Sequence, residues 1–91
     1  MLSTIELKEA FGAMLDASPE ILEVYSTPDF SFEQDTPNLT ILIKKGFNVL
    51  SVWSKVREIY PEVVDVYVIS NPQSMTLQGL RIIWRKGKWL V

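Results

Sequence analysis

The sequence predicts one small α+β domain spanning residues 1–91. It is a two-layer sandwich in the order α-β-β-α-β-β-β, with a mixed sheet of four or five strands and two helices on one face. Three observations indicate this class. The length of 91 residues is typical of one domain. Two segments carry apolar residues at helical spacing, and several others are β-branched or alternating runs bounded by turn residues. The second helical segment also joins two strand segments, which makes those strands parallel if they share a sheet.

The first helix is predicted to begin near Ser3 and end at about Ala17. Ser3 and Glu6 have the spacing of a capping box, in which each satisfies a free backbone N–H of the first turn. Pro19 ends the helix, because the residue before a proline avoids helical backbone angles. One face of this helix is predicted to be apolar, and it consists of Leu7, Phe11, Met14 and Leu15.

Residues 20–44 are predicted to contain a hairpin. The segment Glu20–Tyr25 fits either a helical turn or a strand, and the helical turn is favoured. Phe30–Phe32 and Leu39–Lys44 are then the two strands, with good turn residues between them. The register that places Phe32 opposite Ile41 gathers the apolar residues on one face.

The second helix is predicted between Asn48 and Pro61. Asn48 is a suitable N-cap, and Pro61 cannot continue a helix. Its apolar positions follow helical spacing, and they are Val49, Val52, Trp53, Val56, Ile59 and Tyr60. The chain then crosses over to a strand parallel to Leu39–Lys44.

The last third, Val63–Val91, is predicted to form a three-stranded antiparallel ribbon. The pairing of Val66 with Ile82 and of Trp84 with Trp89 places both tryptophans on the helix-facing side. Its opposite face mixes apolar and charged residues, as interfaces often do. The predicted interface consists of Asp65, Tyr67, Ile69, Arg81, Ile83, Arg85, Lys88 and Leu90.

The function predicted from these residues is non-enzymatic: a small cytoplasmic adaptor or regulatory protein that acts by protein contact, most simply as a homodimer through that outer sheet face. Tyrosine and arginine are common interface anchors. The alternative is a single-stranded nucleic-acid-binding module, in which Tyr67 stacks on a base and Arg81 and Arg85 contact phosphates. A solvated sheet face is the plainer reading of the same residues.

Composition removes several classes of chemistry. The chain has no Cys, which excludes thiolate chemistry, and no His, which removes the commonest general base and the commonest metal ligand. No catalytic residue, cofactor or metal is predicted, and no leader or membrane segment is expected. The net charge is −2, with eight acidic and one basic side chain in residues 1–40 but three acidic and eight basic in residues 41–91.

Two weaker sites stay open. The carboxylates Asp29, Glu33 and Asp35 could bind Mg²⁺ or Ca²⁺ or serve as acid and base, although charged hairpin tips are usually just solvated. Lys44 and Lys45, together with the free N–H groups at the start of the second helix, could bind an anion. No Walker pattern accompanies them, and lysines at a strand end usually mark its exit to solvent.

Overall fold

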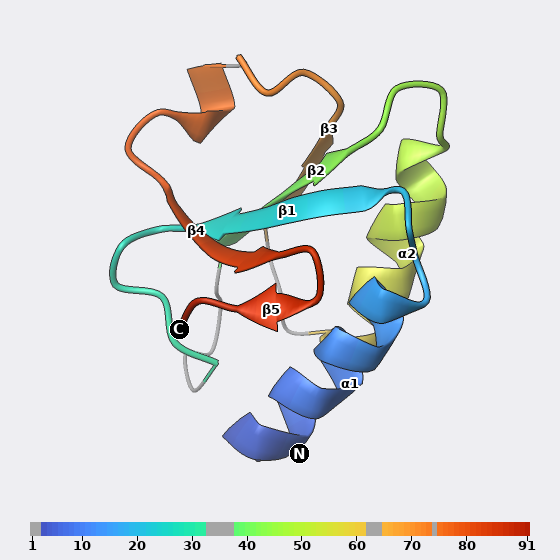
Figure 1. Cartoon of the computed structure of the whole chain (residues 1–91). Coiled ribbons are helices and arrows are strands. Elements are labelled where there is room, and N and C mark those ends of the chain that lie inside the picture. The colour runs from blue at the N-terminus through green and yellow to red at the C-terminus, as the bar shows by residue number, and fades with distance from the viewer. Residues whose placement is uncertain (1–2, 33–37, 62–64, 74) are drawn as a thin grey trace.

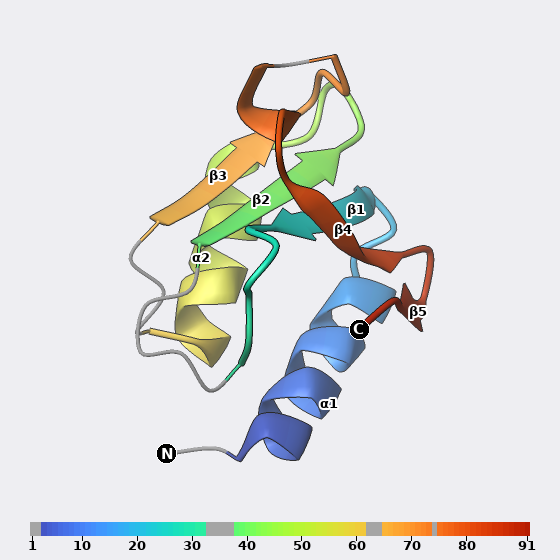
Figure 2. The same cartoon turned by 90° about the vertical axis from the view of Figure 1, so that its left-hand side faces the viewer.

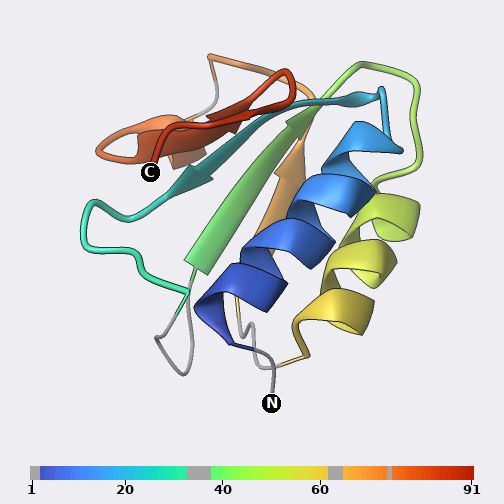
Figure 3. The same ribbon diagram turned by 60° about the horizontal axis from the view of Figure 1, so that its bottom comes forward.

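Five strands form one sheet, and two helices cover one of its faces (Figures 1 and 3). The computed structural model describes residues 3–32, 38–61, 65–73 and 75–91. The elements are α1 (Thr4–Asp16), β1 (Ile21–Ser26), β2 (Asn38–Ile43), α2 (Val49–Ile59), β3 (Asp65–Ile69), a 3-10 helix (Met75–Leu77), β4 (Arg81–Arg85) and β5 (Lys88–Trp89). This confirms the predicted two-layer α+β sandwich and its element order.

The strand order across the sheet is β3-β2-β1-β4-β5, so β3 and β5 are its two edges (Figure 2). β2 and β3 are parallel, as predicted from the helix that connects them. All the other neighbours are antiparallel. The sheet is therefore mixed, and β1 lies at its centre.

The predicted position of the first strand is wrong. β1 is formed by Ile21–Ser26, the segment read as a helical turn, and its Val24 pairs with Ile41 of β2. Phe30 and Phe32 follow β1 in a loop instead of forming a strand. Their rings pack edge to face with centroids 5.0 Å apart, and both side chains are buried. Ring packing thus buries these phenylalanines without any strand pairing. The alternating sequence pattern could not distinguish this loop from a strand.

The predicted ribbon is also wrong in its first pairing. β3 does not contact β4 in the sheet, because β2 and β1 lie between them. Val66 pairs with Leu39, and Ile82 pairs with Tyr25. The second predicted pairing is confirmed, since Trp84 lies opposite Trp89 across a two-residue turn. A short turn fixes its own register, whereas the partner of β3 depends on the whole sheet.

A β-bulge between β1 and β4 changes which side chains of β4 enter the core. Val24 pairs with Trp84 but the next residue, Tyr25, pairs with Ile82, so Ile83 is an extra residue on β4. Ile83 is 1% exposed and belongs to the core, whereas Ile82 is only partly buried. The predicted place of Ile83 on the outer face is therefore wrong, because a bulge interrupts the two-residue alternation.

Both helix starts are confirmed. The side chain of Ser3 accepts a hydrogen bond from the Glu6 backbone N–H in a full capping box, and Asn48 caps α2 through Leu50. The buried residues of the helices are Leu7, Phe11, Leu15, Val52 and Val56, with Tyr60 just beyond α2. Trp53 and Val49 were predicted on the apolar side of the second helix, yet they are 40% and 42% exposed.

The C-terminal segment packs against α1. Trp89 lies so close to Gly12 that a Cβ at Gly12 would be 3.3 Å from its indole nitrogen. The Lys8 ammonium lies 5.6 Å from the Trp89 ring centroid and donates a hydrogen bond of 2.7 Å to the carbonyl of Val91. No helix in the described part of the chain is long and apolar enough to cross a membrane.

Candidate functional site

The predicted interface residues fall into two separated groups. Asp65, Tyr67 and Ile69 lie on the edge strand β3, while the others belong to β4, β5 and the residue after β5. The register places Arg81 opposite Ser26 and Arg85 opposite Glu23. Because of the bulge, the side chains of Arg81 and Arg85 lie on different faces of the sheet. The predicted pairing of Val66 with Ile82 would place Tyr67 opposite Arg81, but β2 and β1 separate these two residues in the structure. The protein contact predicted for these residues stays a prediction. The members that are exposed are Asp65, Tyr67, Arg81, Arg85, Lys88 and Leu90.

The outer sheet face, opposite the helices, is formed by residues of four strands. One row consists of Tyr67, Thr40, Tyr25 and Ile82, and the next consists of Ile69, Leu42, Glu23 and Arg85. The Arg85 Nε donates a 2.8 Å hydrogen bond to the Glu23 carboxylate. Burial first, and then the Glu23 charge, raise the pKa of Tyr25 above 10.0, while Arg85 opposes the shift. These polar groups are thus largely occupied with one another.

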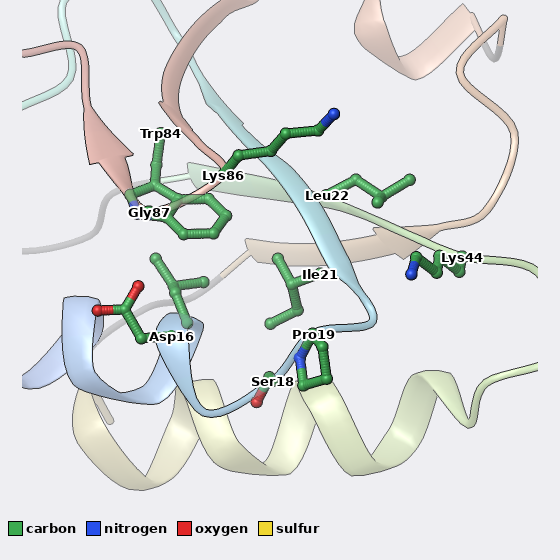
Figure 4. Close-up of a pocket in the computed structure, with 10 residues that line it drawn as sticks. Asp16, Ser18, Pro19, Ile21, Leu22, Lys44, Trp84, Lys86 and Gly87 are labelled. Atoms are coloured by element: carbon green, nitrogen blue, oxygen red, sulfur yellow. The ribbon is translucent and has the colours of Figure 1, made fainter.

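A pocket of about 460 Å³ opens at one end of the sheet, beside the carboxyl end of β2 (Figure 4). The end of α1, the loop to β1, the start of β1, the end of β2 and the turn between β4 and β5 all contribute to it. Its lining residues are Leu15, Asp16, Ser18, Pro19, Ile21, Leu22, Lys44, Trp84, Lys86 and Gly87. The volume lies within the range of small-ligand pockets.

The pocket combines an apolar floor with charged side chains at its rim. The apolar residues are Leu15, Pro19, Ile21, Leu22 and Trp84, and the charged ones are Asp16, Lys44 and Lys86. Lys44 lies at the opposite end of the pocket from Asp16 and Gly87 (Figure 4). Both lysines are exposed, so their ammonium groups are available to a ligand. The arrangement suits an anion that also carries an apolar body.

Backbone irregularities accompany this pocket. The pairing of β1 with β2 shifts between Ile21 and Glu23, which makes Leu22 an extra residue on the pocket wall. Lys86 has φ 45° and is the one non-glycine residue with positive φ in the described chain. Such a backbone angle favours glycine or asparagine, so a lysine there costs about 1 kcal/mol or more. The positive φ of both Lys86 and Gly87 is what a two-residue hairpin turn requires, whereas bulges such as the one at Leu22 are enriched next to active sites.

A small polar network supports the loop under the pocket. The Lys55 ammonium of α2 lies 3.8 Å from the Glu20 carboxylate and 3.4 Å from the Ser18 hydroxyl. The Glu20 carbonyl accepts a 2.9 Å hydrogen bond from the Lys44 backbone N–H, which fixes the end of β2 beside the loop. Ser18 is 1% exposed. Lys55 is therefore occupied in holding the loop, whereas Lys44 and Lys86 point their charge at solvent.

The structure offers no evidence for a metal site in the residues it describes. Within residues 3–32, 38–61, 65–73 and 75–91, no three Asp, Glu, His or Cys side chains gather closely enough to hold an ion. Of the carboxylates weighed from the sequence, Asp29 is exposed in the loop after β1. Glu33 and Asp35 lie outside the described residues.

The sequence pointed to only part of this pocket. Of the anion site predicted at Lys44 and Lys45, only Lys44, the residue after β2, is among the residues that line the pocket. Nothing in the sequence placed Asp16 and Lys86 near Lys44, since this arrangement depends on β4 lying next to β1. The one local signal was the Lys86-Gly87 turn, where a lysine occupies a position that usually takes Asn or Asp.

Comparisons with known proteins give one informative result. No protein-family model matches the chain, and no curated protein matches it significantly in sequence. The crystal structure of a putative nucleotidyltransferase from Sulfolobus solfataricus is similar to it, with a TM-score of 0.65 and 20% sequence identity. The similarity covers 97% of this chain and 86% of that one.

This likeness contradicts the prediction of a non-enzymatic adaptor. The neighbour that shares the fold over almost the whole chain is described as a putative enzyme, so the absence of Cys, His and a known motif does not by itself argue against an enzyme. The sequence argument took the absence of Cys and His as evidence against an enzyme, yet phosphate-transfer chemistry in general relies on positioning and charge and requires neither a thiol nor an imidazole. The chain shares its fold with a putative nucleotidyltransferase.

Proposed function

We propose that this chain is an enzyme domain that binds a nucleotide in the pocket at the carboxyl end of β2 and takes part in nucleotidyl transfer. The observation that carries the proposal is the fold likeness to the putative nucleotidyltransferase over 97% of the chain. The pocket supports it independently, because its mixture of cationic and apolar residues suits a nucleotide.

Each part of a nucleotide has a suitable counterpart in the pocket. Lys44 and Lys86 are exposed ammonium groups that would contact phosphate oxygens as point charges. Leu22 and Trp84 belong to the apolar part of the lining, against which the base would pack. The Asp16 carboxylate is an acceptor for sugar hydroxyl groups, as acidic residues are in other nucleotide sites.

The two lysines would also favour the transfer step. In nucleotidyl transfer an acceptor oxygen forms a bond to the α-phosphorus, and the bond from that phosphorus to pyrophosphate breaks. Negative charge then accumulates on the departing pyrophosphate. Lys44 and Lys86 would stabilise this charge if the β- and γ-phosphates lie against them, since fixed cations act most strongly where charge develops.

Phosphoryl-transfer enzymes commonly use Mg²⁺ to neutralise the same charge. The pocket has a single carboxylate, Asp16, and no group of three potential ligands occurs among the described residues. These residues alone do not fit a metal site, and we assign no step to a metal ion.

Calorimetric titration with ATP, GTP, CTP and UTP, each with Mg²⁺ present, tests the binding part. We expect Lys44→Ala and Lys86→Ala each to weaken binding roughly tenfold, the effect of losing about 1.4 kcal/mol from a charge-assisted contact. Lys88→Ala is the matched control, because Lys88 is an exposed lysine of β5 outside the pocket lining. Binding should also weaken as the salt concentration rises.

Release of pyrophosphate from the tightest-binding nucleotide, together with transfer of α-phosphorus label, tests the enzymatic part. If none of the four nucleotides binds at millimolar concentration, the proposal is wrong. It is equally wrong if Lys88→Ala weakens binding as much as Lys44→Ala, because the effect would then reflect overall charge and not this pocket.

A further inference from the structure

The two edges of the sheet differ in how well they are protected against pairing with another strand. β5, at one edge, has two residues, follows the Lys86-Gly87 turn and itself contains Lys88. Short length and lysine are the usual devices that prevent an edge from pairing. β3, at the other edge, runs over Asp65–Ile69 and contains no lysine, no proline and no bulge in its pairing with β2.

The outer edge of β3 has no partner in the described chain. Its one neighbour in the sheet is β2, and none of the described turn and loop hydrogen bonds involves Asp65–Ile69. In an edge strand, every second residue points its backbone N–H and C=O groups away from the neighbouring strand, here β2, in the plane of the sheet. β3 therefore presents a row of backbone donors and acceptors that another strand can use (Figure 2).

The sequence of β3 is complementary to itself when two copies run antiparallel. A twofold axis at Tyr67 places Tyr67 opposite its counterpart, Val66 opposite Val68 and Asp65 opposite Ile69. All five residues are then paired, whereas an axis at Val66 or Val68 pairs only three. Because opposite residues share a face, the valines join the helix-covered side of the sheet and Tyr67 stays on the outer face. The two aspartates are not opposite each other, so no like charges meet.

The flank of α2 beside β3 extends this surface. α2 packs against β3, and its Lys55 side is directed to Ser18 and Glu20 in the loop before β1. At 3.6 residues per turn, Val49 and Trp53 lie roughly 120° and 160° round the helix axis from Lys55. They are 42% and 40% exposed. Figure 3 shows α2 on the β3 side of the sheet and α1 nearer its middle.

We propose that two copies of this chain associate through antiparallel pairing of their β3 strands, which joins their sheets into one. The two α2 helices then lie on the same side of the joined sheet, and the Val49–Trp53 flanks face each other across the twofold axis. The interface thus combines backbone hydrogen bonds with apolar helix contacts, and each chain contributes the same residues, as a twofold dimer requires. This inference is independent of the nucleotide pocket, which lies at the ends of β2 and β4.

Disulfide trapping tests the register directly, because the chain contains no cysteine of its own. Opposite residues of antiparallel strands have Cα atoms about 4.5–5.5 Å apart, which falls within the range that a disulfide bridges. Under mild oxidation, Tyr67→Cys should form a covalent dimer at least tenfold faster than Leu90→Cys, its control beyond the other edge of the sheet. A mixture of Asp65→Cys and Ile69→Cys should cross-link to each other faster than Asp65→Cys cross-links to itself.

Sedimentation equilibrium provides the second measurement. The unmodified chain should be a dimer at high micromolar concentration, and Tyr67→Lys should be a folded monomer, because it places two like charges opposite each other. Tyr67 is 53% exposed, so this substitution should leave the far-ultraviolet circular dichroism, which reports the helices and strands, unchanged. A monomeric unmodified chain, or equal cross-linking of Tyr67→Cys and Leu90→Cys, would overturn the inference.

Discussion

Ile82 and Ile83 are adjacent residues of the same type whose burial differs, which permits a matched test of the bulge in β4. Ile83 is 1% exposed within the core, whereas Ile82 lies partly exposed on the outer sheet face. Truncation of a fully buried isoleucine to alanine costs about 2–5 kcal/mol, so we expect Ile83→Ala to lose roughly 3 kcal/mol. Ile82 is half-buried and lies on the face opposite the helices, so Ile82→Ala should lower the free energy of unfolding by about 1 kcal/mol.

These losses are large for a small domain. At about 0.05–0.15 kcal/mol per residue, 91 residues give a total stability of about 5–14 kcal/mol. Ile83→Ala should therefore lower the melting temperature by roughly 12–24 °C and Ile82→Ala by roughly 4–8 °C. Urea unfolding followed by circular dichroism gives both free energies. Equal losses, or a greater loss at Ile82, would refute the bulge and restore the regular alternation predicted from the sequence.

Three further outcomes follow from hydrogen bonds and a pKa shift. Ser3→Ala should cost about 1 kcal/mol of unfolding free energy, because it removes the capping acceptor of α1, and Ser3→Asp should preserve stability. Tyr60→Phe should cost about 1–3 kcal/mol in the same assay, since its hydroxyl donates a 3.1 Å bond to the buried Phe32 carbonyl; no loss would mean that water replaces it. Burial and the Glu23 carboxylate raise the pKa of Tyr25, so the unfolded chain releases this proton first and stability should fall as pH rises above 10.0. Tyr25→Phe should reduce that fall, and an unchanged pH profile would contradict the shift.

The sequence was sufficient for features that depend on neighbouring residues. Ser3 with Glu6 and Asn48 at the second helix located both helix starts, because capping is decided within one turn. The two-residue turn at Lys86-Gly87 likewise determined the Trp84–Trp89 pairing. The parallel relation of β2 and β3 followed from the helix between them, since an antiparallel neighbour needs no such crossover.

Features that depend on distant segments were not predictable in this way. Local alternation in Glu20–Tyr25 was ambiguous, and only the neighbours β2 and β4 make this segment the central strand. β3 and β4 were placed together because they are adjacent in sequence, although β1 and β2 separate them. The pocket was missed for the same reason, because Lys44 and Lys86 line one pocket only when β4 is beside β1.

The central position of β1 has a consequence for how the chain folds. Its partner β4 is distant in sequence, with Glu23 and Arg85 separated by 62 positions. β1 and β4 cannot pair until the chain between them has been ordered, and long-range contacts of this kind slow folding. A chain that ends before β4 would leave β1 as an unpaired edge and expose apolar residues beneath it. We therefore expect α1, β1 and β2 to acquire stable tertiary structure only once Arg81–Trp89 is available.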